Sequence, residues 1–202
     1  MGKKINPILF RLGKTNYYKN LWYNEKKYSK TLKIIILLKE IIEKNISFIN
    51  ISNINIILTN KLKINIYLND LNKIYDFYEY LDIFIYEISK IIKKNIIINF
   101  CLENFINSKI LSNNILNQLE TKTSIKKIIK KEIIKNLKYF NGCKIQISGR
   151  LDGIDIARKE WYLIGSIPLH TIKNEIDYNF CEYITQYGIL GIKIWIFKKN
   201  EK

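Results

Sequence analysis

The sequence predicts an α+β protein of two domains. Its 202 residues suit two domains of about 100 residues each. Apolar residues recur at helical spacing in some segments and alternate with polar residues in others, which is the mixture that an α+β fold requires. This pattern restarts near residue 105. We therefore predict a basic N-terminal arm over residues 1–24, a first domain over 25–104 and a second domain over 105–202.

The first domain is predicted to run helix, strand, strand, helix, strand. Residues 48–58 and 61–68 alternate apolar and polar side chains, and Thr59-Asn60 between them suits a tight turn. Helical spacing flanks this hairpin on both sides. The predicted elements are a helix over 25–45, the two strands, a helix over 71–94 and a strand over 96–102.

The second domain is predicted to begin with two helices and to continue with strands. Asn141-Gly142 is expected to stop the second helix, because glycine commonly follows the last helical turn. The predicted elements are helices over 106–119 and 122–140, a strand over 144–149, and strands with their connections over 153–165, 167–178 and 187–197.

The predicted helix over 122–140 separates apolar from basic side chains. At about 100° per residue, one arc holds Ile125, Ile129, Ile133, Leu137 and Phe140. A ladder of ammonium groups on the opposite half suits the regularly spaced phosphates of nucleic acid, with little sequence preference. The alternative is the solvated face of an amphipathic helix. We name this half the lysine face; it holds Lys126, Lys127, Lys130, Lys131, Lys135 and Lys138.

The composition is dominated by residues that AT-rich codons encode. The chain has 45 Ile, 31 Lys and 24 Asn, but one Ala and no Val. All eight Gly, both Pro and all three Arg lie within residues 2–13 or 142–191. We interpret this unevenness as mutational pressure in an AT-rich genome, in which Ile has taken over most of the packing in the cores.

The chain carries a net charge of +16, from 34 basic and 18 acidic residues. This charge favours a polyanionic partner, with nucleic acid ahead of a membrane surface, although codon drift toward Lys supplies part of it. No apolar run reaches the roughly 18 residues of a membrane span, and we expect no membrane partner. Cys101, Cys143 and Cys181 are too far apart for a zinc site or a disulfide framework, so we expect reduced thiols and no bound metal.

Arg150 and Arg158 stand in a segment that drift has left intact. A planar guanidinium binds phosphate through two points, which Lys cannot do, so an Arg that remains among 31 Lys indicates a geometric need. The alternative is an ion pair within the chain, to Asp152, Asp155 or Glu160.

Catalytic chemistry has no support in the sequence. His170 is the only histidine and has no Ser or Cys motif to accompany it, so a structural or RNA-contacting role is expected. Asp177 and Glu182 are a weak signal for a metal site. The glycine motifs that cradle phosphates in nucleotide-binding enzymes are absent. We expect neither an enzyme nor a cofactor.

Several ordered motifs carry a resemblance to a known family. Residues 1–13 read MGKKINPILFRLG, and residues 148–162 read SGRLDGIDIARKEWY. Together with Pro168–Thr171, Ile176–Tyr178 and Tyr187–Phe197, they resemble the third protein of the bacterial-type small ribosomal subunit. The resemblance follows the whole chain in order, although the middle matches in pattern more than in residues.

The resemblance implies an N-terminal type II KH-like domain and a C-terminal α/β two-layer domain. Members of this family bind small-subunit rRNA in the head, help to form the entrance for mRNA, and neighbour ribosomal proteins ten and fourteen. The family's basic entrance motif, usually with a pair of Arg, falls on Lys126, Lys127 and Lys130, and we add the adjacent Lys131. The expected rRNA contacts are Lys3, Lys4, Arg11, Arg150, Arg158, Lys159 and His170.

The first domain departs from the family at its RNA-gripping loop. A KH domain clamps the nucleic-acid backbone with a G-x-x-G loop, but residues 69–74 contain no glycine. We expect a degenerate KH-like scaffold that packs without gripping RNA at this loop. The alternative function is an RNA-binding KH-like module that acts outside the ribosome.

The compartment is predicted from the start of the chain and from its composition. The match to the family begins at Met1, which leaves no room for a transit peptide. With the AT bias, this predicts an organelle-encoded protein of a plastid, apicoplast-like. The alternatives are the cytoplasm of an AT-rich endosymbiotic bacterium and a mitochondrion.

Overall fold

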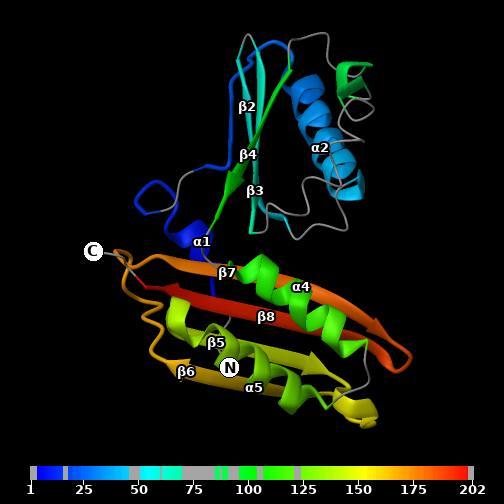
Figure 1. The fold of residues 1–202 in the computed structure, drawn as a ribbon, viewed down its shortest axis with the longest axis vertical. Helices are drawn as coiled ribbons and strands as arrows, with labels where there is room; N and C mark the ends of the chain where they lie inside the picture. Colours follow the sequence, from blue (N-terminus) through cyan, green and yellow to red (C-terminus); the bar gives the residue numbers. More distant parts are fainter. Residues whose placement is uncertain are drawn as a thin grey trace. The chain divides into compact units, whose positions relative to one another are not determined.

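A computed structural model gives the fold of the chain (Figure 1). The chain forms two compact units. We call residues 1–17 with 105–202 the large unit, and residues 18–104 the small unit. The structure describes residues 4–15, 18–45, 51–59, 61–69, 85–86, 88–90, 96–103, 107–120 and 124–199.

The small unit has a four-stranded mixed sheet with helix α2 (Tyr28–Asn45) packed against it. Strand β2 (Ile51–Leu58) forms an antiparallel hairpin with β3 (Leu62–Leu68). The outer strands, β1 (Asn20–Trp22) and β4 (Ile96–Leu102), each run parallel to their neighbour. A parallel neighbour requires a crossover connection, and α2 lies in the one between β1 and β2.

Isoleucine and leucine fill the core of the small unit. Burial alternates along β3, because successive side chains of a strand point to opposite faces. The hairpin, α2 and β4 are elements that the sequence predicted. The predicted helix over 71–94 lies largely outside the described residues, although the described Ile88 is fully buried in this core. The buried set also includes Ile35, Leu38, Ile42, Ile56, Leu62, Ile64, Ile66 and Leu68.

The large unit has two layers, an antiparallel sheet of order β6-β5-β8-β7 and two helices that cover one face of it (Figure 1). A short helix, α1 (Pro7–Phe10), also belongs to this unit. The other elements are α4 (Ser108–Leu119), α5 (Ile125–Asn136), η1 (Leu137–Tyr139), β5 (Phe140–Gly149), η2 (Leu151–Gly153), β6 (Arg158–Gly165), β7 (Ile176–Thr185) and β8 (Gly188–Lys198).

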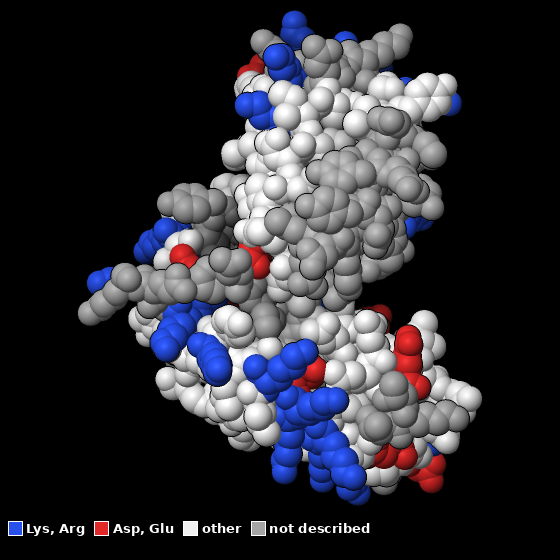
Figure 2. Space-filling model, viewed as in Figure 1, with Lys and Arg blue, Asp and Glu red and all other residues white. Residues whose placement is uncertain are grey.

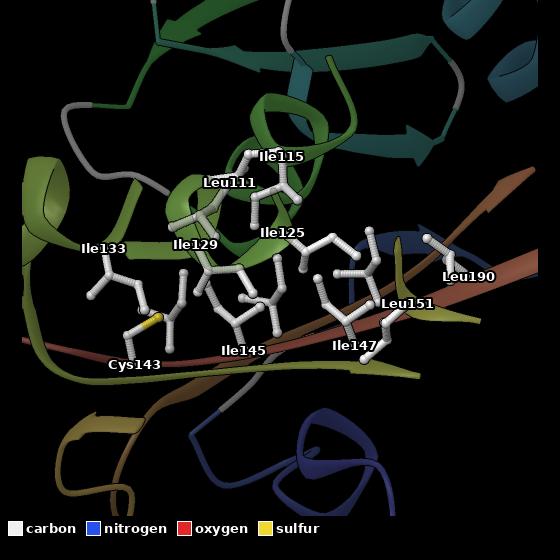
Figure 3. Close-up of a cluster of buried hydrophobic side chains, with 14 of the residues drawn as sticks. Leu111, Ile115, Ile125, Ile129, Ile133, Cys143, Ile145, Ile147, Leu151 and Leu190 are labelled. Carbon is white, nitrogen blue, oxygen red and sulfur yellow. The ribbon is translucent and has the colours of Figure 1, made fainter. Parts of the chain in front are cut away.

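Figure 3 shows the core between these helices and the sheet. Ile129 and Ile133 of α5 point toward Ile145 and Cys143 of β5, and all four side chains are buried. Large-to-small changes in such a core typically cost about 2–5 kcal/mol. This packing fixes the rotation of α5, and so decides which of its side chains face solvent.

The predicted N-terminal arm is divided between the two units. The Asn6 side chain accepts a hydrogen bond from the Ile8 N–H at 2.9 Å, and Pro7 occupies the first turn, so α1 begins as a capped helix. This helix lies against β7 in the large unit. Residues 20–22 form β1 in the small unit. The predicted arm therefore contributes an element to each unit.

The second helix of the large unit ends earlier than predicted. The α-helix stops at Asn136, η1 follows, and Phe140 already pairs with Lys198 in the sheet. The prediction failed because Phe140 is a buried residue of strand β5. Its position in the sequence continued the apolar arc of the predicted helix by coincidence. Gly142 does not stop a helix: an added Cβ would collide with the backbone of Ser166, which is a close approach that only glycine permits.

Candidate nucleic-acid interface

The lysine face is exposed on α5. Ile125, Ile129 and Ile133 are buried against the sheet, so the lysines between them are turned to solvent. Figure 2 shows Lys and Arg side chains gathered over α5. All six lysines of the face are exposed: Lys126, Lys127, Lys130, Lys131, Lys135 and Lys138.

A single carboxylate approaches the described lysines of this face within ion-pair distance. Glu160 Oε1 on β6 lies 3.9 Å from Lys126 Nζ, and the two side chains are 36% and 65% exposed. An exposed pair at this distance contributes about 0–1 kcal/mol and does not neutralise the face. The pair Lys126 and Lys127 also lies in the first turn of α5, where the helix dipole adds positive potential and no acidic residue opposes it.

Arg150 makes the intramolecular ion pair that was the alternative to phosphate binding. Its Nη2 lies 2.8 Å from Asp155 Oδ1, and its Nε donates to the carbonyl oxygen of Ile154 at 3.0 Å. Its guanidinium also lies over the ring of Tyr187, 5.6 Å from the centroid. By contrast, Arg158 and Lys159 begin β6 with exposed side chains.

Arg11 was predicted to contact rRNA, but the structure buries it completely. Its guanidinium donates to the carbonyl oxygens of Asn174 at 2.8 Å, Leu169 at 3.0 Å and Thr171 at 2.9 Å, and more distantly to Pro7 and Pro168 at 3.2 Å. Every donor nitrogen of the fork is therefore engaged inside the protein. We remove Arg11 from the RNA-contacting set.

The structure brings Lys4 and His170 together. They line a cavity of about 340 Å³, with Phe10, Arg11 and Trp195 among its other walls. Both side chains are exposed. Lys3 lies outside the described residues. The predicted set is thus spread over the lysine face, the start of β6 and this cavity.

Lys144 is a basic residue that the sequence interpretation missed. It lies on β5 between two aromatic rings, with its Nζ 5.2 Å from the centroid of Trp161 and 5.3 Å from that of Trp195. Burial lowers the pKa of Lys144, and the charge of Lys4 lowers it further. The sequence predicted only a strand over 144–149, and the aromatic neighbours of Lys144 come from β6 and β8, which are distant in sequence.

Among the residues that the structure describes, no group of three or more His, Cys, Asp and Glu is arranged to hold a metal ion. Within the same ranges, no helix is both long enough and apolar enough to cross a membrane.

An α+β unit that presents a helix of exposed lysines is typical of proteins that bind RNA. Residues 115–196 match the family described as ribosomal protein S3, C-terminal domain. Small ribosomal subunit protein uS3 of Carsonella ruddii is 59% identical over 203 residues, which cover 100% of both chains. The proteins of the same name from Geotalea daltonii and Geobacter sulfurreducens are each 36% identical, and cover 98% of this chain and 97% and 96% of their own. The chain belongs to the uS3 family.

Proposed function

We propose that this chain is a structural constituent of the small ribosomal subunit that binds its rRNA in the head and helps to form the entrance for mRNA. Membership of the uS3 family supports the ribosomal role. The observation that supports the mRNA role is the lysine face of α5. The isoleucines on the other side of this helix pack in the core, so the lysines are turned to solvent. We expect no catalytic activity and no cofactor.

The chemistry of the lysine face suits the backbone of a passing strand. An ammonium group binds phosphate as a point charge, and contacts to phosphate carry no sequence information, so messengers of any sequence are held equally. Lys126, Lys127, Lys130 and Lys131 lie on the two turns that follow Ser124. We assign the mRNA contact to these four residues.

The rRNA contacts are assigned to exposed basic residues outside α5. Arg158 and Lys159 at the start of β6, with Lys4 and His170 beside the cavity, present their side chains to solvent. Lys3 stays in this set as a sequence prediction. Arg150 remains only as a secondary contact, because Asp155 already pairs with its guanidinium.

We also infer that the small unit is a type II KH-like domain without a working clamp. The hairpin β2–β3, the helix α2 and the parallel strand β4 support this assignment. Among residues 69–74, which lack glycine, only Asn69 is described. Mutation of residues 69–73 is expected to leave RNA affinity unchanged. A loss of RNA binding in a folded variant would contradict the loss of the clamp.

The partners and the compartment follow from the family. We expect contacts with ribosomal proteins ten and fourteen in the head. Relatives of 59% and 58% identity come from Carsonella, an endosymbiotic bacterium, and favour the cytoplasm of an AT-rich endosymbiont over the plastid that we first predicted. Plastid and mitochondrial origins remain the alternatives.

The decisive experiment separates assembly from messenger handling. Replacing Lys126, Lys127 and Lys130 with Gln is expected to leave incorporation into small subunits intact and to slow translation of messengers with stable hairpins near the start. The matched control replaces Lys30, Lys33 and Lys44 on α2, which are also exposed and carry the same charge. Normal translation of structured messengers by the α5 variant would refute the mRNA role.

The alternative, an RNA-binding module outside the ribosome, is tested by sedimentation. A ribosomal constituent migrates with small subunits in moderate salt. A chain that stays at the top of the gradient while it binds free RNA would support the alternative.

A further inference from the structure

The sheet of the large unit has one face that α4 and α5 do not cover. Ile145 and Ile147 of β5, and Ile192 and Ile194 of β8, point into the core beneath α4 and α5. Because side chains alternate along a strand, their neighbours point to the opposite side. We call that side the open face. Among the described residues of the N-terminal segment, Pro7 and Phe10 cover the part of it beside Trp195, where they line a cavity.

One row of side chains crosses all four strands on the open face. Trp161 of β6 pairs with Gln146 of β5, Gln146 pairs with Lys193 of β8, and Lys193 pairs with Phe180 of β7. Residues in cross-strand register share a face. The rings at the two ends are the most exposed members, with Trp161 57% and Phe180 46% exposed. At about 4.8 Å between strands, the two rings stand about 14 Å apart.

Each exposed ring has an ammonium group beside it. Lys193 Nζ lies 5.7 Å from the centroid of Phe180. Lys144 Nζ lies 5.2 Å from the centroid of Trp161. The next row carries Lys159, exposed, and one exposed carboxylate, that of Glu182. The described part of the open face therefore combines aromatic surface with net positive charge.

We propose that this row binds single-stranded RNA, with bases stacked on Trp161 and Phe180 and phosphates held by Lys144 and Lys193. Aromatic side chains on an open four-stranded sheet are a known way of holding unstacked bases. Gln146, between the rings, offers both an amide donor and an acceptor to a base edge. This RNA site is separate from the lysine face, which lies on the helical side of the sheet.

The charge pattern favours RNA over a protein as the occupant. The two rings are separated by Gln146 and Lys193, so they do not form the continuous apolar patch of a protein-docking site. An apolar partner would also bury the ammonium groups of Lys144 and Lys193 without counter-charges, which is costly. Phosphates supply those counter-charges.

Stacking is measured as the ratio of two affinities, that for a short oligouridine strand to that for an abasic strand of equal length. The abasic strand keeps the phosphates and lacks the bases. The full chain is expected to bind the oligouridine at least about fivefold more tightly, since one stacked base contributes about 1–3 kcal/mol. Trp161→Leu and Phe180→Leu are each expected to bring this ratio toward one and to leave affinity for the abasic strand unchanged.

Two controls distinguish this site from the lysine face. Tyr23→Leu removes a ring that is 81% exposed in the small unit and should leave the ratio unchanged. Replacing Lys126, Lys127 and Lys130 with Gln should weaken both strands alike and keep the ratio. The two proposals can therefore be rejected independently: the experiments on the lysine face test the mRNA role, and the affinity ratio tests RNA binding on the open face.

The proposal is overturned if the wild-type ratio is one, or if both leucine variants keep the wild-type ratio. Variants that keep the ratio but no longer enter small subunits would assign the open face to a protein partner instead. If thermal unfolding shows that Trp161→Leu does not fold, Phe180→Leu decides, since Phe180 is 46% exposed. Lys193→Gln removes a phosphate contact and should weaken binding of both strands alike.

Discussion

Asp177 on β7 accepts a hydrogen bond from the backbone N–H of Ser108, the first residue of α4, at 2.7 Å. The preceding Asn107 makes no side-chain capping bond to the helix. A carboxylate from 69 residues further along the chain therefore takes the place of a local cap and sits at the positive end of the helix dipole. Asp177, which had only a weak claim as a metal ligand, holds the helical layer to the edge of the sheet.

Replacing Asp177 with Ala is expected to lower the free energy of unfolding by about 1–2 kcal/mol, because the N-terminus of α4 loses a charge-assisted cap. Urea denaturation of the full chain measures the change. Glu182→Ala, an exposed carboxylate on the same strand, should stay within about 0.5 kcal/mol of wild type. Equal effects of the two substitutions would show that the cap contributes nothing.

Replacing Arg11 with Lys is expected to lower the free energy of unfolding by about 2–4 kcal/mol, because one ammonium group cannot reach carbonyl oxygens that lie around a planar fork. The matched control is Arg158→Lys at an exposed position, where the expected change is within about 0.5 kcal/mol. Both unfolding curves are read in the same buffer. If Arg11→Lys proved as stable as wild type and bound RNA more weakly, our removal of Arg11 from the RNA-contacting set would be wrong.

The elements that the sequence predicted well are those in which only one face is buried. The strand β3 alternates cleanly, and α5 sets Ile125, Ile129 and Ile133 against lysines, so each period was visible. The residues of β7 beyond Tyr178 escaped prediction because both of its faces carry apolar side chains. Phe180 is exposed on the open face and Cys181 is half-buried on the other, which leaves no alternation to detect.

Of the candidate RNA-binding surfaces, the sequence predicted only the one whose charged residues recur at helical spacing. The lysine face follows from local spacing on one helix. The burial of Arg11 depends on carbonyl oxygens near residue 170, and the open-face row depends on the register of four strands. Neither relation exists within a sequence window, so an Arg in a basic segment and a Trp in a strand gave no sign of their roles.

Replacing Lys126, Lys127 and Lys130 with Gln is expected to reduce the salt dependence of RNA binding. Each lost phosphate contact lowers the slope of log K against log salt by about 0.7–0.9, so the triple variant should lose about two units or more. Filter binding or anisotropy across a salt series gives the slope. The same change at Lys30, Lys33 and Lys44 should alter the slope by less than about one unit. Equal losses in both variants would mean that only net charge matters.

The stability of the chain is expected to fall in strong alkali through Cys143. Burial beneath α5 raises the pKa of this thiol to about 12. The unfolded chain ionises the thiol near its ordinary pKa of 9.0, so above that pH the unfolded state has released a proton that the folded state retains. Stability from this group is therefore complete below pH 9.0 and is lost as the pH rises toward about 12, with a slope approaching about 1.4 kcal/mol per pH unit.

Cys143→Ala isolates this contribution. The variant removes the thiol and is expected to flatten the decline of the unfolding free energy above pH 9.0, although a small cavity lowers its stability at neutral pH. Alkylation at pH 8 gives a second measurement, in which Cys101, half-buried, is expected to react before Cys143, which stays unmodified until urea unfolds the chain. Parallel pH profiles for wild type and variant, or prompt labelling of Cys143 in the native chain, would rule out a thiol that burial keeps neutral.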